Sequence, residues 1–276
     1  MKFTKLYLIL STICSLLVVK FTLGNDLEAT KEIFKPEFQQ IIDSANLRGA
    51  ILVYDLEKDK YYSNDFVWSK EGKLPASTFK IPNSIIGLET GIIENENTIF
   101  FWDGEQRALD TWEQNLILKD AFQFSCVPCY QEVARGIGPE RMKEYLSKYN
   151  YGSMEVDSAN IDIFWLQGGS GINQFQQINF LKRLYKSELP ISEKTEKIMK
   201  EILLLEENEQ YKMSGKTGWS IQNGINNGWF VGYVESGSKI YYFATNVEPG
   251  EGFRMDMFPG IRKDVTFAAL KTLDII

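Results

Sequence analysis

The sequence predicts an α+β protein of two lobes, in which an antiparallel sheet built from both ends of the chain is flanked by helices and joined to a helical lobe. Segments rich in β-branched and aromatic residues lie at 50–63 and 211–247, whereas residues from about 110 to 205 are mostly helical in pattern. Strands on either side of a helical middle are typical of α+β proteins. The chain has 276 residues, 44% of them hydrophobic, which is enough for a large core.

The first 24 residues are predicted to be a secretory signal peptide. Two lysines precede an apolar run over 6–19, and small residues at 22–24 suit a cleavage site. A membrane anchor is the alternative, but Lys20 interrupts a run already shorter than the roughly 20 residues that a span needs. We therefore expect an exported, periplasmic protein in which residues 25–276 form a single domain without a membrane segment.

The first elements of that domain follow from turn and capping residues. A helix is expected at 36–46, because Pro36 stands at its start and a glycine lies beyond its end. A β-hairpin is expected from 50–55 and 60–63 around a charged turn. A second helix is expected from Ser77 to Gly91, where Pro82 is tolerable only within the first turns because proline lacks a backbone donor.

The remaining elements follow from periodicity. Ser192 is a suitable N-cap for the last of the three central helices. Tyrosine, phenylalanine, valine and tryptophan dominate the strand-like segments. The expected helices are 141–149, 173–185, 192–205 and the closing 264–273, and the expected strands are 211–214, 228–235 and 239–247.

The charge balance restricts the class of partner. The formal charge is −7, and removal of residues 1–24 deletes three lysines and makes it −10. An acidic chain without a basic patch argues against a nucleic-acid partner and against anionic membrane surfaces. A local basic pocket for a small anionic substrate remains compatible with this composition. A monomer and a homodimer are both compatible with the sequence.

Of the three cysteines, Cys14 lies in the predicted signal peptide, and Cys126 and Cys129 form a Cys-Val-Pro-Cys sequence. The βαβ pattern of a thioredoxin-like redox protein is missing around them. A structural disulfide and two free buried thiols both remain open. A zinc site would need two further ligands, and the chain has no other cysteine or histidine to supply them. We therefore expect no metal.

The absence of histidine also excludes a Ser-His-Asp triad and any histidine acid/base step. A serine nucleophile then needs another base. Lys80 follows Ser77 by three residues, which puts both on one helical face with Cβ atoms about 5–6 Å apart. Alone, such a pair is more often two solvated side chains than a catalytic site.

Two later motifs strengthen the hypothesis. Ser125-Cys126-Val127 and Lys216-Thr217-Gly218-Trp219 begin 48 and 139 residues after Ser77. A Ser-x-x-Lys motif followed by a second serine motif and Lys-Thr-Gly is the signature of penicillin-recognising serine enzymes.

The chain resembles the class D, or oxacillinase-type, serine β-lactamases over essentially all of residues 25–276. The second motif has the Ser-x-Val form of that class. Where the family has Tyr-Gly-Asn, this chain has Tyr-Gly-Ser with Ser153. Further matching residues are Tyr151-Gly152, Phe164-Trp165-Leu166, Gln177 with Phe180-Leu181, the Gly-Trp-Phe-Val-Gly run at 228–232, and Arg262.

The resemblance implies hydrolysis of β-lactam antibiotics through an acyl-enzyme on Ser77, and resistance to these drugs. It implies that Lys80 is N-carboxylated by carbon dioxide or bicarbonate, with no other cofactor, and serves as general base for acylation and deacylation. The indole N–H of Trp165 would hold the carboxylated group, and Ser125 would relay a proton to the leaving nitrogen. Core packing is the ordinary alternative for Trp165, and a helix cap for Ser125.

Lys80 must lose its charge to act as a base. A free lysine has a pKa of about 10.4, so a base near neutral pH needs a fall of about three pH units. Burial against Phe79, Val127, Trp165 and Leu166 would supply it by desolvating the ammonium. Val127 and Leu166 are expected to cover the Lys80 side chain.

The remaining implied roles concern the substrate. Backbone N–H groups of Ser77 and Trp219 would form the oxyanion hole. Lys216, Thr217 and Arg262 would bind the substrate carboxylate, and Gly218 would let the substrate approach the strand edge. A surface ion pair is the alternative for Arg262.

Other activities fit the same motifs less well. A peptidoglycan transpeptidase or carboxypeptidase shares them, but no additional domain is evident. A drug-sensing domain that acylates and stalls belongs to proteins with several membrane spans. A binding protein without chemistry would leave the three motifs unexplained.

Overall fold

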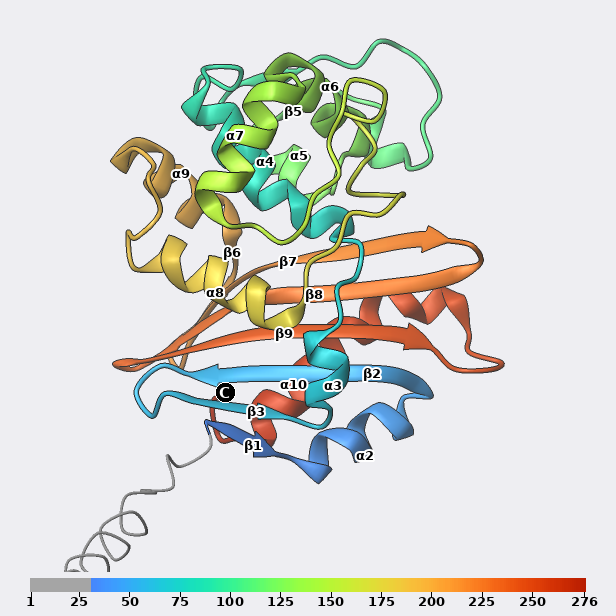
Figure 1. Ribbon diagram of the computed structural model, residues 1–276, viewed down its shortest axis with the longest axis vertical. Helices are drawn as coiled ribbons and strands as arrows, with labels where there is room; N and C mark the ends of the chain where they lie inside the picture. The colour runs from blue at the N-terminus through green and yellow to red at the C-terminus, as the bar shows by residue number, and fades with distance from the viewer. Residues whose placement is uncertain (1–30) are drawn as a thin grey trace, which may run out of the picture. The chain divides into compact units, whose positions relative to one another are not determined.

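The central feature of the fold is a sheet in the order β1-β3-β2-β9-β8-β7-β6, seen in a computed structural model that describes residues 31–276 (Figure 1). The two ends of the chain meet in the middle of the sheet, where β2 pairs with β9. Neighbouring strands are antiparallel except β1 and β3, which are parallel. The strands are β1 (Glu32–Phe34), β2 (Leu47–Asp55), β3 (Lys60–Ser63), β6 (Leu204–Glu207), β7 (Lys212–Gln222), β8 (Ile225–Ser236) and β9 (Lys239–Pro249).

Each face of this sheet buries its own hydrophobic cluster. On β2, Leu52 and Tyr54 belong to one cluster and Ile51 and Val53 to the other, because successive side chains of a strand point to opposite faces. Helix α8 (Gln174–Tyr185) covers one face, while α2 (Pro36–Ser44) and α10 (Phe258–Thr272) pack together on the other.

The helical lobe lies beyond β7 in Figure 1. Helix α4 packs against α6, α7 and α9, so it forms the centre of this lobe. Among residues 31–276, no helix combines the length and the apolar character of a membrane span. The elements are the 3-10 turn η1 (Ala76–Phe79), α4 (Lys80–Glu89), α5 (Leu118–Gln123), α6 (Val127–Ile137), α7 (Pro139–Tyr149) and α9 (Glu193–Leu203), with α3 (Phe66–Lys70), η2 (Asp110–Trp112), η3 (Met255–Met257) and the short ribbon of β4 (Ile99–Phe100) and β5 (Leu116–Ile117) elsewhere in the chain.

The predicted α+β class and the sheet shared by both chain ends are confirmed. Two expectations were wrong in detail. The sheet is mixed because of β1, and the strand expected at 211–214 continues to Gln222. Between the expected helices, the stretch 150–173 forms turns, in which Asp157 accepts from the backbone N–H groups of Ala159 and Asn160. The predicted signal peptide lies outside the described residues.

Candidate active site

Ser77 and Lys80 lie in contact at the point where η1 becomes α4. The Lys80 Nζ donates a hydrogen bond of 3.2 Å to the Ser77 Oγ. Both side chains are buried, with 8% of Ser77 and 1% of Lys80 exposed. Pro82 is the third residue of α4. A backbone N–H in the first turn of a helix has no intrahelical acceptor, so proline costs no hydrogen bond at this position. The local sequence therefore brings an amine and a hydroxyl together inside the protein.

Apolar and aromatic surroundings remove the Lys80 amine from water. Phe79 stacks on Trp165 with ring centroids 5.2 Å apart, and the Tyr130 ring lies 4.9 Å from the Lys80 Nζ. Burial lowers the pKa of Lys80 to about 7, because the charged ammonium is desolvated. Near neutral pH a large share of this side chain is therefore a neutral amine, which can accept a proton.

Trp165 has a buried donor without a partner. The side chain is fully buried, and its indole N–H makes no hydrogen bond among the described residues. Its backbone carbonyl accepts from the Ala76 N–H at 2.9 Å, which ties the Trp165 loop to η1. Because buried N–H groups are almost always paired, this one is a candidate donor to a group outside the polypeptide. The carboxylate of a carboxylated lysine fits that requirement.

Ser125 lies between α5 and α6 with a backbone φ of 55°. Its Oγ accepts a hydrogen bond from the Lys216 Nζ, which also donates to the Thr217 carbonyl at 3.0 Å. The alternative of a helix cap at Ser125 is wrong, because Cys126 is the N-cap of α6 and its sulfur accepts from the Cys129 N–H. The second serine motif thus contacts the third motif directly.

Lys216 is buried beside other cations. Only 4% of it is exposed, and its Nζ lies 5.7 Å from the centre of the Phe122 ring. Burial, and then the positive charges of Lys80, Arg262 and Lys263, hold the pKa of Lys216 well below its usual value. The three motifs therefore place two desolvated amines, Lys80 and Lys216, in one buried site.

Gly218 allows β7 to approach the nucleophile. A Cβ atom at this position would lie 3.0 Å from the Pro75 carbonyl oxygen and 3.2 Å from the Ser77 amide nitrogen. A side chain would therefore force β7 away from η1. The motif Lys216-Thr217-Gly218-Trp219 lies within β7, and it does not follow the strand as the sequence indicated.

Trp219 is half-buried, and its ring packs edge-on against Phe258 at 5.4 Å. Its indole N–H donates to Asn226 Oδ1 at 2.9 Å, so this donor is paired with Asn226 and not with Ser77. Backbone groups of residues two apart in a strand face the same edge. The Trp219 N–H therefore points to the same edge of β7 as the Thr217 carbonyl, which accepts from Lys216.

Arg262 is buried, so the alternative of a surface ion pair is wrong. It lies in α10 and donates to the backbone carbonyls of Gly218, Phe258 at 3.1 Å and Pro259 at 2.9 Å. Burial lowers its pKa to about 10. Its guanidinium thereby connects α10 to the β7 segment that faces Ser77.

Val127 and Leu166 are half-buried, Val127 as the first residue of α6 and Leu166 directly after Trp165. Leu166 packs against the same core cluster as Phe79 and Trp165. The sequence did not single out Tyr130, which lies over Lys80. The available signal was Pro128, which is typical of a helix start and puts Tyr130 one turn inside α6.

The cysteine pair forms a disulfide between Cys126 and Cys129, which settles the question that the sequence left open. No group of three or more His, Cys, Asp or Glu side chains within residues 31–276 is arranged to hold a metal ion.

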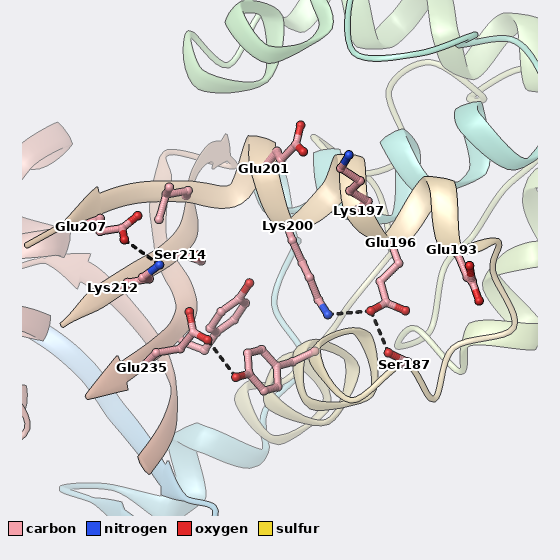
Figure 2. Close-up of a pocket in the computed structure, with 13 residues that line it drawn as sticks. Ser187, Glu193, Glu196, Lys197, Lys200, Glu201, Glu207, Lys212, Ser214 and Glu235 are labelled. Atoms are coloured by element: carbon pink, nitrogen blue, oxygen red, sulfur yellow. Dashed lines mark hydrogen bonds and ion pairs between the residues drawn. The ribbon is translucent and has the colours of Figure 1, made fainter. Parts of the chain in front are cut away.

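A separate surface hollow of about 780 Å³ lies among α8, α9 and strands β6 to β8 (Figure 2). Glutamates and lysines alternate around it, and two ion pairs, Lys200–Glu196 and Lys212–Glu207, both span 2.6 Å. None of the candidate catalytic side chains lines this hollow. It is therefore distinct from the site around Ser77.

The chain is similar to proteins of known class. The family model of the penicillin-binding protein transpeptidase domain matches residues 46–263. The β-lactamase OXA-48 of Klebsiella pneumoniae is 38% identical over 229 residues, which cover 83% of this chain and 84% of that protein.

Two solved structures are also similar. A class D β-lactamase from Nostoc has a TM-score of 0.82 at 39% identity, covering 87% of this chain and 99% of that one. A class D β-lactamase from Sebaldella termitidis has a TM-score of 0.84 at 35% identity, covering 89% of this chain and 98% of that one. The chain therefore belongs to the penicillin-binding protein transpeptidase family and, within it, to the class D β-lactamases.

Proposed function

We propose that this protein is a serine hydrolase that opens the ring of β-lactam antibiotics through a Ser77 acyl-enzyme, and so confers resistance to them. The observation that carries the proposal is the buried Lys80 amine, 3.2 Å from the Ser77 Oγ and with a pKa lowered to about 7. A nucleophile in contact with a base of near-neutral pKa meets the requirement for general-base catalysis.

In the acylation step, the Ser77 hydroxyl loses its proton to the Lys80 side chain while the Oγ forms a bond to the β-lactam carbonyl carbon. The oxyanion accepts from the backbone N–H groups of Ser77 and Trp219. Ser77 is the second residue of η1, where a backbone N–H has no intrahelical acceptor. The amide C–N bond then breaks, and Ser125 delivers a proton to the nitrogen. The contact between Ser125 and Lys216 keeps that hydroxyl in place.

The side chain of Lys80 is suited to carboxylation. Carbon dioxide adds to a neutral amine with release of one proton, and the low pKa of Lys80 provides that amine. The added carboxylate would supply two anionic oxygen acceptors for the protons of Ser77 and of the deacylating water. The unpaired indole N–H of Trp165 would donate to it. One base thereby serves both steps, and water returns Ser77 to its starting state.

Substrate binding is assigned to the buried cations. Arg262, whose pKa of about 10 leaves it charged near neutral pH, attracts the carboxylate of a penicillin or cephalosporin. That carboxylate would in turn favour the charged form of Lys216, which donates to it. Arg262 donates once from each of its three nitrogens to a backbone carbonyl, so two of its five N–H groups remain for further acceptors. Thr217 is half-buried on the same strand and adds a hydroxyl donor.

The test compares the parent with Ser77→Ala on a penicillin, a chromogenic cephalosporin and a carbapenem. Ser77→Ala is expected to abolish turnover and the acyl adduct that intact-protein mass spectrometry detects in the parent. Ser69→Ala is the matched control, because Ser69 is also buried but its hydroxyl contacts Ser63 away from the site. Turnover by the Ser77 variant contradicts the proposal. An adduct without turnover in the parent indicates a drug sensor or a transpeptidase.

We further propose that residues 1–24 are removed on export to the periplasm and that the mature protein, residues 25–276, is one catalytic domain. No nucleic-acid or membrane partner is proposed. The intact mass of the protein recovered from the periplasm tests the cleavage, and sedimentation velocity distinguishes a monomer from a homodimer.

A further inference from the structure

We propose that the Cys126–Cys129 disulfide is a positioning element for Ser125, so that the rate of acylation depends on the redox state of this cysteine pair. The inference rests on the proposed role of Ser125 as the proton relay. It adds a dependence on redox state that none of the three catalytic motifs has by itself.

The first support is the backbone of Ser125. Its φ of 55° lies in the left-handed region, which residues other than glycine and asparagine seldom adopt without help from their surroundings. The two neighbouring turns hold it there, since the Ser125 N–H donates to Phe122 at 3.2 Å and the Cys126 N–H to Ala121 at 2.9 Å. The orientation of the Ser125 Oγ toward Lys216 depends on this conformation.

The second support is the way α6 begins. Cys126, directly after Ser125, is the N-cap of α6, and its sulfur accepts from the Cys129 N–H at 3.2 Å. Sulfur is a weak acceptor, and serine, threonine, aspartate or asparagine normally fill this position. The covalent bond to Cys129 adds a restraint that the weak capping hydrogen bond does not provide. It joins the first turn of α6 to Cys126, the residue directly after Ser125.

The Lys80 side of the site is held independently. Tyr130 follows Cys129 and lies over the Lys80 Nζ, but its hydroxyl is 2.7 Å from the Ser84 Oγ and its carbonyl accepts from Asn83 at 3.1 Å. Both of these partners belong to α4. Opening the disulfide is therefore expected to loosen the α6 side of Ser125, which then depends on its bonds to α5 and Lys216 alone, while Tyr130 and Lys80 stay in place. Acylation, which uses Ser125, and deacylation, which uses Lys80, are expected to respond differently.

The disulfide borders a surface hollow of about 190 Å³ that both cysteines line. Cys129 is 9% exposed and Cys126 only 1%, so a small reductant would reach the bond from the Cys129 side. A small dithiol transfers two electrons and two protons to the S–S bond, which leaves two thiols in the protein and a cyclic disulfide in the reductant. An oxidising compartment would keep the bond closed.

The experiment uses the full chain, oxidised or reduced with dithiothreitol that is then removed under argon. Thiol titration verifies the reduction, and rapid-quench measurements with a chromogenic cephalosporin give the acylation and deacylation rate constants. Reduction is expected to slow acylation about tenfold, which corresponds to about 1.4 kcal/mol. Deacylation is expected to change less than about twofold. The number of active sites by burst titration stays constant, and reoxidation restores the rate.

Two variants complete the test. Cys129→Ala keeps the capping sulfur of Cys126 but lacks the disulfide. Its acylation rate constant is expected to equal that of the reduced parent and not to change with dithiothreitol. Ser69→Ala, which keeps both cysteines and lies away from the site, is expected to respond to dithiothreitol like the parent.

Equal acylation rates in the oxidised and reduced parent overturn the inference. So does a loss of active sites at an unchanged rate per site, which would mean that the bond only stabilises the fold. An oxidised parent that forms no acyl-enzyme overturns the proposed function, and this inference with it.

Discussion

Replacing Trp165 by phenylalanine tests the proposed base most directly. The variant keeps an aromatic ring to stack on Phe79 but removes the indole N–H, which has no partner among the described residues. If that N–H donates to a carboxylate on Lys80, its loss removes one hydrogen bond to a charged group, worth about 1.5–3 kcal/mol. The affinity of Lys80 for carbon dioxide is then expected to fall roughly 10- to 150-fold.

The assay is the initial rate of cephalosporin hydrolysis in degassed buffer, titrated with bicarbonate. The bicarbonate concentration for half-maximal rate is expected to rise by that factor in Trp165→Phe. Trp229→Phe is the matched control, because Trp229 is also fully buried but its indole N–H already donates to the Leu74 carbonyl at 2.8 Å. An unchanged bicarbonate dependence in Trp165→Phe refutes the assignment of this N–H, whatever happens to stability.

Three further predictions concern the same site. Lys80→Ala is expected to slow deacylation so far that intact-protein mass spectrometry traps the acyl adduct, and a variant that turns over like the parent would be incompatible with Lys80 as base. Burial lowers the pKa of Lys80 to about 7, so the amine protonates as the pH falls through about 7, and the rate is expected to drop there and to recover with added bicarbonate. A flat rate profile from about pH 6 to about pH 8, one unit on either side of this pKa, would contradict the prediction. Gly218→Ala is expected to cut acylation at least about tenfold by pushing β7 from Ser77, whereas Gly260→Ala, whose Cβ would meet no atom closer than 3.8 Å, is expected to leave it unchanged in the same rapid-quench assay.

The sequence predicted the site better than it predicted the strands around it. Ser77 and Lys80 are close in the chain, so helical spacing alone brought them together correctly. The strand expected at 211–214 ended before the motif that begins at Lys216, whereas β7 contains that motif together with Gly215 and Gly218. Both glycines are needed inside β7, since a Cβ at Gly215 would lie 2.6 Å from the Val231 carbonyl oxygen.

Contacts between distant segments were beyond the sequence alone. Nothing in the local pattern relates Tyr130 to Lys80 or Phe122 to Lys216, because these contacts form only when α5 and α6 pack on α4 and β7. The burial of Arg262 depends in the same way on α10 lying against the sheet. The burial of Lys80 and its lowered pKa were expected from the sequence, whereas the contacts with Tyr130 and Phe122 were not.

The buried cations also influence the thermal behaviour of the protein. Lys80, Lys216 and Arg262 are at most 5% exposed, and Asp55, the one buried carboxylate within residues 31–276, pairs with Lys58 elsewhere. Lys216 and Arg262 lose their hydration on folding, which lowers the pKa of both side chains, so their burial costs stability. A non-reactive anion that binds beside them favours their charged forms and is expected to raise the melting temperature. Under the proposed function the same two side chains bind the antibiotic, so a variant that is stabilised by replacing them is expected to bind the antibiotic more weakly.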